Sequence, residues 1–191
     1  MGTELNGISV AFVVSNEGIE EAELLRPWEH VQAEGGAPKL VAIEPGEVEL
    51  RRHLDQAGRF PVDLVTRDAR ASDFDALVLP GGVANADRLR SDGPAVALVK
   101  EMFRAGRPAA VICHAPWVLV EADLVRGRTL TSWPSLRTDI LNAGGTWVDA
   151  EVQVCASGPN TLVTSRKPDD LDAFNAKLTD VLRAARGSAA A

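Results

Sequence analysis

Residues 109–116 read AAVICHAP, an apolar run that leads directly into a cysteine, a histidine and a proline. The run Ala109–Cys113 has the length and the apolar character of a strand that is buried on both faces. Pro116 suits the first turn of a following helix, which the pattern extends to Ala122. The stretch therefore predicts a strand, a turn and a helix, with Cys113 at the turn.

The rest of the chain alternates in the same way between short apolar strands and helical patterns. Strands are predicted at Gly7–Ser15, Lys39–Glu44 and Asp75–Pro80, with weaker candidates at Thr129–Thr131, Trp147–Asp149 and Leu162–Thr164. Helices are predicted at Glu20–Glu34, Pro94–Arg104 and Pro168–Ala185, a hairpin within Glu47–Val65, and a frayed tail at 187–191. This alternation predicts a single α/β domain over residues 1–191 with a mainly parallel sheet, whose ligands lie beyond the carboxyl ends of the strands.

Composition limits the partners of the chain. Its 191 residues carry a formal charge of −7, and no basic stripe is present that could neutralise a phosphate backbone. No stable nucleic-acid partner is therefore expected. The polar start of the chain and the absence of a long apolar run predict no signal peptide, no membrane partner and a cytoplasmic location. In that compartment both cysteines are expected to be free thiols.

Cys113 and His114 are the main candidates for chemistry. The positive end of the predicted helix is expected to favour the Cys113 thiolate, which makes this residue the candidate nucleophile. The backbone amide of His114 lies at the same helix start and can hydrogen-bond an oxyanion, and its side chain can transfer a proton. Gly81-Gly82 ends another predicted strand, so Gly82 is expected to supply a second oxyanion amide.

Four glutamates surround the start of the first predicted helix, where most are expected to be solvated and one can reach the active site. Their spacing does not choose among Glu17, Glu20, Glu21 and Glu23. No pair of cysteines or histidines has the spacing of a zinc site, so neither a metal nor a cofactor is predicted.

Seven fragments in this order resemble the PfpI-type intracellular protease family, within the ThiJ/PfpI superfamily of class I glutamine amidotransferase-like folds. The resemblance covers Gly7 to about Arg183. The fragments are Glu20–Leu24 (EEAEL), Asp75–Gly82 (DALVLPGG), Cys113–Pro116 (CHAP), Thr131–Pro134 (TSWP), Asn142–Gly144 (NAG), Trp147–Glu151 (WVDAE) and Ser165–Leu171 (SRKPDDL).

The resemblance implies a flavodoxin-like three-layer sandwich with a nucleophile elbow at Cys113. It selects Glu20 as the carboxyl group beside the thiol, and it matches His114 and Gly82 to the catalytic histidine and the oxyanion-side glycine. It also implies a homodimer or a larger homo-oligomer, in which Asp87 of a neighbouring subunit completes a triad with His114. Ala115 departs from the usual glycine, and its methyl group is expected to narrow the pocket and to disfavour peptide-sized substrates.

We predict an enzyme in which the Cys113 thiolate adds to the carbonyl of a small reactive compound, in the manner of a glyoxalase III or a deglycase that serves in stress defence. One alternative is an intracellular cysteine peptidase, in which His114 and Asp87 protonate the leaving amine of a peptide substrate. The other alternative is a redox-sensing stress protein that responds through oxidation of Cys113.

Overall fold

A seven-stranded sheet forms the centre of the computed structural model, which describes residues 4–189. Neighbouring strands pair in parallel, except that β11 runs antiparallel to β12. The order across the sheet is β11 (Val152–Cys155), β12 (Leu162–Ser165), β8 (Ala109–Ile112), β7 (Ala76–Leu79), β1 (Ser9–Val14), β3 (Ala37–Ala42) and β6 (Leu64–Val65).

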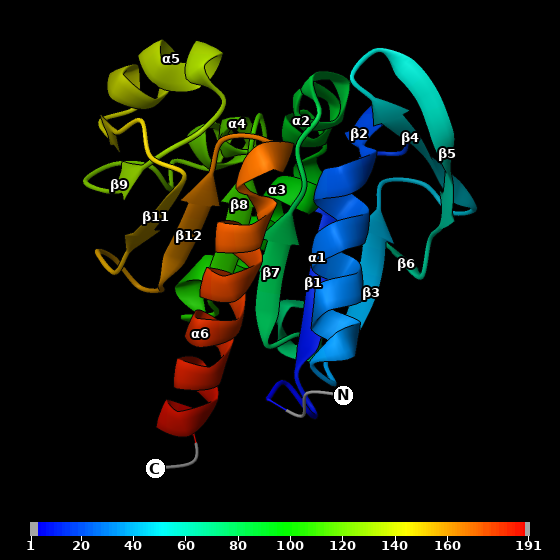
Figure 1. Ribbon diagram of the computed structural model, residues 1–191, viewed down its shortest axis with the longest axis horizontal. Helices are drawn as coiled ribbons and strands as arrows, with labels where there is room; N and C mark the ends of the chain where they lie inside the picture. Colours follow the sequence, from blue (N-terminus) through cyan, green and yellow to red (C-terminus); the bar gives the residue numbers. More distant parts are fainter. Residues whose placement is uncertain (1–3, 190–191) are drawn as a thin grey trace.

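Helices cover both faces of this sheet (Figure 1). One face packs against α1 (Glu21–Ala33) and α6 (Leu171–Ala189). The opposite face packs against α2 (Val83–Arg90), α3 (Gly93–Arg104), α4 (Pro116–Glu121) and α5 (Arg137–Asn142). The predicted mainly parallel three-layer α/β sandwich is therefore confirmed.

The central strand β1 shows why valine-rich runs form this sheet. Val10, Phe12 and Val14 pack toward α1 and α6, whereas Ala11 and Val13 pack toward α3. All five side chains are fully buried. A strand enclosed on both faces needs apolar residues at every position, and an uninterrupted apolar run meets that requirement.

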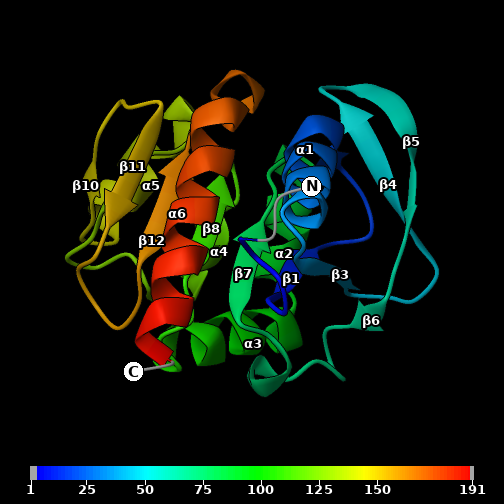
Figure 2. The same cartoon turned by 60° about the horizontal axis from the view of Figure 1, so that its bottom comes forward.

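Within the described residues, two smaller sheets and three 3₁₀ turns complete the architecture. The first sheet contains β2 (Ile19–Glu20), β4 (Glu47–Arg52) and β5 (Asp55–Pro61), and the second contains β9 (Thr129–Leu130) and β10 (Thr146–Trp147). The 3₁₀ turns are η1 (Ala71–Asp73), η2 (Pro134–Leu136) and η3 (Pro168–Asp170). Figure 2 shows the β4–β5 hairpin at the edge of the molecule that carries β3 and β6, and this is the hairpin predicted within Glu47–Val65.

The sequence pattern did not reveal two of the helices. The α2 segment is only eight residues long and half of them are polar, and no side chain caps its start at Gly82. The α5 segment is six residues long and also lacks a side-chain cap. At the other end of the chain, α6 continues through residues 187–189 of the segment predicted as a tail, while 190–191 lie outside the described residues.

No helix within residues 4–189 has the length and apolar character that a membrane span requires.

The start of α3 provides a test of local stability. The Asp92 carboxylate caps this helix by accepting a hydrogen bond from Ala95 N at 2.8 Å, and it also accepts one from Thr66 Oγ1 at 2.9 Å. Replacing Asp92 with alanine should lower the free energy of unfolding by about 1–2 kcal/mol, because it removes a helix cap. Urea unfolding measures this loss. Asp180→Ala, which removes an exposed carboxylate of α6, should change the free energy by less than about 0.5 kcal/mol; equal losses in both variants would contradict the capping role.

Candidate active site

Cys113 occupies a sharp turn between β8 and α4. Its φ angle of 62° lies in the left-handed region, which non-glycine residues rarely adopt. Cys113 N donates a hydrogen bond to Ser165 O at 3.1 Å, and Cys113 O accepts one from Trp133 N at 2.9 Å. These contacts with two neighbouring segments hold the strained residue in place, so the predicted elbow is present.

The carboxyl group that contacts the thiol belongs to Glu23, in the first turn of α1. Glu23 is fully buried and forms a side-chain hydrogen bond with Cys113. Its Oε2 atom accepts a second hydrogen bond, at 2.9 Å, from Gly81 N at the end of β7. The carboxyl is therefore positioned by one helix and two strand ends.

The assignment of the neighbouring carboxyl to Glu20 was wrong. Glu20 ends β2, immediately before α1, and its Oε2 accepts a hydrogen bond from His53 N in the β4–β5 turn at 3.0 Å. Glu20 still lines the same pocket and its charge acts on Glu23. It supports the hairpin, however, while Glu23 reaches the sulfur.

Helical phase carries the signal that distinguishes these glutamates. Glu23, Pro27 and Val31 are spaced by four residues and are all buried, so Glu23 lies on the face of α1 that packs against the sheet. The position of Glu23 on this buried face explains why its carboxyl lies inside the protein.

Two glycines make room for this contact. A Cβ atom at Gly81 would overlap Glu23 Oε2 and lie 2.6 Å from Cys113 Cβ. Gly82 has a φ angle of 97°, and a Cβ atom there would overlap Gly18 O. The backbone amides of Gly82 and His114 both hydrogen-bond the Cys113 sulfur, which places two donors beside the reacting atom.

Asn85 of α2 fixes the glycine turn, and sequence reasoning missed it. The residue is fully buried. Its Nδ2 donates hydrogen bonds to Pro80 O and Gly81 O, both at 2.9 Å, and its Oδ1 accepts one from Ser15 N at 2.7 Å. Because these partners follow two different strands, only the folded chain reveals the role of Asn85 in holding the turn.

The thiol and the carboxyl form one coupled acid pair. Burial, followed by the charge of Glu20, raises the pKa of Glu23 to about 8. Burial and the charge of Glu23 also raise the pKa of Cys113, although the amides of Gly82 and His114 oppose this change. The lowered thiol pKa expected from the helix start is thus reversed by burial. A thiolate forms here when Glu23 holds the proton that the sulfur gives up.

His114 contacts the sulfur through its side chain, with Nδ1 3.1 Å from Cys113 Sγ. Its ring lies 5.5 Å from that of Trp117 and stacks on Trp133 with centroids 5.7 Å apart. Burial lowers the pKa of His114 to about 4. The imidazole is therefore neutral at neutral pH and a weak acceptor for the thiol proton.

Asp87 lines the pocket beside Cys113 and Glu23, whereas Ala115 lies in the core. Asp87 is exposed on α2 and lines the pocket, and within residues 4–189 it makes no hydrogen bond to His114. Ala115 is buried in the core between the sheet and the helices α3 and α4. Its methyl group does not line the pocket, so the expectation that Ala115 narrows it was wrong.

The pocket has a volume of about 740 Å³ and contains Cys113, His114, Glu20, Glu23 and Gly82. It lies at the carboxyl ends of β7 and β8, where this fold class binds ligands. A larger groove of about 1080 Å³ lies at the amino ends of the central strands and contains none of these residues. Among residues 4–189, no three histidine, cysteine or acidic side chains are grouped to hold a metal ion.

Comparison with known proteins identifies the family. Residues 8–181 match the DJ-1/PfpI family. The chain belongs to this family. Deglycase PH1704 of Pyrococcus horikoshii is 37% identical, and the match covers 92% of this chain and all of that protein. YraA of Bacillus subtilis, whose name marks it as a candidate cysteine protease, is 34% identical over 91% of this chain and 98% of its own.

Solved structures agree on the DJ-1/PfpI fold. Oxidized DJ-1 of Toxoplasma gondii superposes with a TM-score of 0.79 over 92% of this chain and 91% of its own. Its sequence identity of 23% limits this likeness to the fold.

The raised pKa of Glu23 predicts a pH-dependent stability. The unfolded chain releases this proton near pH 4.5, whereas the folded protein keeps it to about pH 8. The free energy of unfolding of wild type should therefore fall as pH rises between these values. Compared with Glu23→Gln, the fall should be at most about 1.4 kcal/mol per pH unit. Urea unfolding across this range measures the difference. Glu29→Gln, an exposed change on the same helix, should follow wild type; a constant difference between wild type and Glu23→Gln would show that Glu23 ionises normally.

Proposed function

We propose that this protein is a cytoplasmic cysteine-dependent enzyme that acts on small reactive carbonyl compounds, of the glyoxalase III or deglycase type. The observation that carries the proposal is the contact between Cys113 and a buried carboxyl whose pKa is raised to about 8. A general base is most effective when its pKa lies close to the working pH. The deglycase name of a 37% identical relative supports the same class of reaction.

With methylglyoxal as substrate, the Cys113 sulfur adds to the aldehyde carbon while Glu23 accepts the thiol proton. The amides of Gly82 and His114 stabilise the negative charge that develops on the oxygen of the adduct. Glu23 then passes the thiol proton to this oxygen, which gives a hemithioacetal and restores the Glu23 carboxylate. Glu23 then removes the proton from the former aldehyde carbon and returns it to the adjacent carbon, while the hydroxyl proton moves from the first oxygen to the former ketone oxygen. The resulting 2-hydroxyacyl thioester is hydrolysed by water, which releases lactate and restores the thiol.

The 3.1 Å contact between Cys113 and His114 favours a second candidate, a cysteine peptidase. In that reaction His114 must hold a proton for the leaving amine. Burial opposes this state, because it lowers the pKa of His114 to about 4. A carboxylate from a neighbouring subunit, such as Asp87, would raise that pKa by stabilising the imidazolium.

Three substitutions test the assignment of roles. Cys113→Ser should abolish lactate formation from methylglyoxal, and Glu23→Gln should lower turnover by about 10²-fold or more, as expected for loss of a general base. Glu20→Gln should lower it by less than about 5-fold, because the carboxylate of Glu20 supports the hairpin turn.

Parallel assays with methylglyoxal and a fluorogenic peptide give the result. Lactate formation that survives Cys113→Ser would contradict the proposal. Peptide cleavage that depends on Cys113, without turnover of the aldehyde, would establish the peptidase in its place.

We further propose that the protein forms a homodimer or a larger homo-oligomer in which Asp87 of a neighbouring subunit approaches His114. Sedimentation should then show at least a dimer, and Asp87→Asn should reduce peptide cleavage more than aldehyde turnover, because only the amine leaving group needs a protonated His114. Asp172→Asn, an exposed change at the start of α6, serves as the control. A monomer with full activity would eliminate the shared arrangement.

A further inference from the structure

Exposed apolar side chains gather around the candidate active site. Among residues 4–189, five large hydrophobic side chains are exposed: Leu54, Val83, Trp133, Leu141 and Val154. Leu54, Val83 and Trp133 all line the Cys113 pocket, with exposed fractions of 91%, 55% and 37%. Exposed apolar side chains that gather around one pocket indicate a binding surface, whereas exposed apolar side chains scattered singly do not.

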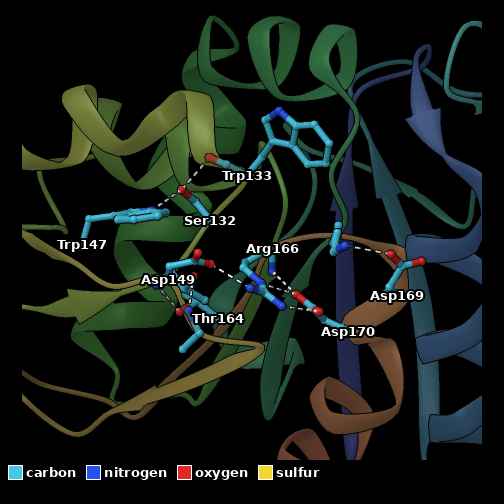
Figure 3. A network of polar contacts seen from close by, with 11 residues as sticks. Ser132, Trp133, Trp147, Asp149, Thr164, Arg166, Asp169 and Asp170 are labelled. Carbon is cyan, nitrogen blue, oxygen red and sulfur yellow. Dashed lines mark hydrogen bonds and ion pairs between the residues drawn. The ribbon is translucent and has the colours of Figure 1, made fainter.

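Polar contacts hold the Trp133 segment in one position (Figure 3). Trp147 Nε1 donates a hydrogen bond to Ser132 Oγ at 3.0 Å, and Ser132 Oγ donates one to Trp133 O at 2.9 Å. Thr131 N donates to Thr164 Oγ1 at 3.0 Å, which ties the same segment to β12. The Trp133 indole, stacked on His114, is therefore a preformed wall of the pocket.

The turn of the β4–β5 hairpin lines the same pocket. Leu54 occupies this turn, and the contact between His53 N and Glu20 Oε2 fixes the turn beside the pocket. Val83, the first residue of α2, lies next to Gly82 and lines the same pocket. The three apolar groups thus come from three separate elements around the sulfur.

The charges of the pocket disfavour an anionic substituent on the substrate. Four carboxyl groups line it, from Glu17, Glu20, Glu23 and Asp87. The two arginines that also line it are already engaged, since Arg88 pairs with Glu17, and Arg51 lies 3.5 Å from Glu49. With four carboxyl groups and two arginines that each face a carboxylate of the chain, the charge around the pocket is predominantly acidic.

We propose that the substrates are 2-oxoaldehydes with a flat, uncharged apolar substituent, which Trp133 stacks and Leu54 covers. This inference rests on the proposed function and names the substrate class of that site. An aryl group beside the reacting carbonyl gains apolar contact and ring stacking that a methyl group does not. Trp133 and Leu54 then determine specificity, and Ser132 and Trp147 position Trp133.

The test compares kcat/KM for phenylglyoxal and methylglyoxal within each variant. Trp133→Ala should lower the ratio of the two values by roughly 10-fold, the effect of losing one aromatic pair. Leu54→Ser, a change at an exposed turn that leaves the core intact, should lower it by about 3-fold. Leu141→Ser, at a residue of α5 that is 42% exposed and outside the pocket, should leave the ratio unchanged.

Binding to Cys113→Ser protein separates this inference from the proposed function. Titration calorimetry with benzamide and acetamide, which differ only in the aryl or methyl group on the carbonyl, should show tighter binding of benzamide, and adding Trp133→Ala should remove that preference. Absence of turnover with both aldehydes would contradict the proposed function, and the amide ratio would then decide the inference. Ratios of kcat/KM that are unchanged in the Trp133 and Leu54 variants would overturn the proposed substrate class. Loss of oligomers in Leu54→Ser without a change in the preference for phenylglyoxal would also overturn it, because the exposed side chains of Leu54, Val83 and Trp133 would then bind a second copy of the chain.

Discussion

The hydrogen bond between the Glu23 carboxyl and the Cys113 thiol is the contact on which the geometry of the site depends. It requires α1 to begin at Glu21, so that Glu23 faces the sheet. It requires a residue without a side chain at Gly81, where a Cβ would overlap the carboxyl. It also requires the left-handed backbone of Cys113. Hydrogen bonds from Asn85 of α2 hold the glycine turn, and contacts with Ser165 and Trp133 hold Cys113, so the packed sandwich positions the pair.

This arrangement carries an energetic cost that supports a chemical role. Glu23 is fully buried, and its Oε1 atom has no hydrogen-bond partner among the described residues. A buried ionised carboxylate without full pairing is unfavourable by several kcal/mol, so the group holds its proton to a higher pH. Retaining an acid next to a strained cysteine is typical of sites where stability is exchanged for reactivity.

The sequence predicted the parts of this structure that depend on local pattern. The buried strands around Val10–Val14 and Ala109–Ile112 follow from apolar runs, and the turn at Cys113 follows from a strand that leads into a helix start. The family resemblance, in addition, implied that this turn is a nucleophile elbow. Glu23 was not selected because four glutamates lie within seven residues and only helical phase separates them. The roles of Asn85 and Trp133 depend on contacts between distant segments, which no local pattern records.

The central claim is that Glu23 controls the proton of Cys113, and the pH dependence of Cys113 alkylation tests it most directly. Iodoacetamide labelling would be followed by mass spectrometry in proteins that carry Cys155→Ser, with and without Glu23→Gln. We predict that the rate in the Glu23 protein rises through about pH 8, the pKa of this carboxyl. In Glu23→Gln the rise should move to higher pH, because burial still disfavours the thiolate and no base remains. Identical profiles in the two proteins, or a rate already maximal at pH 5, would contradict the account.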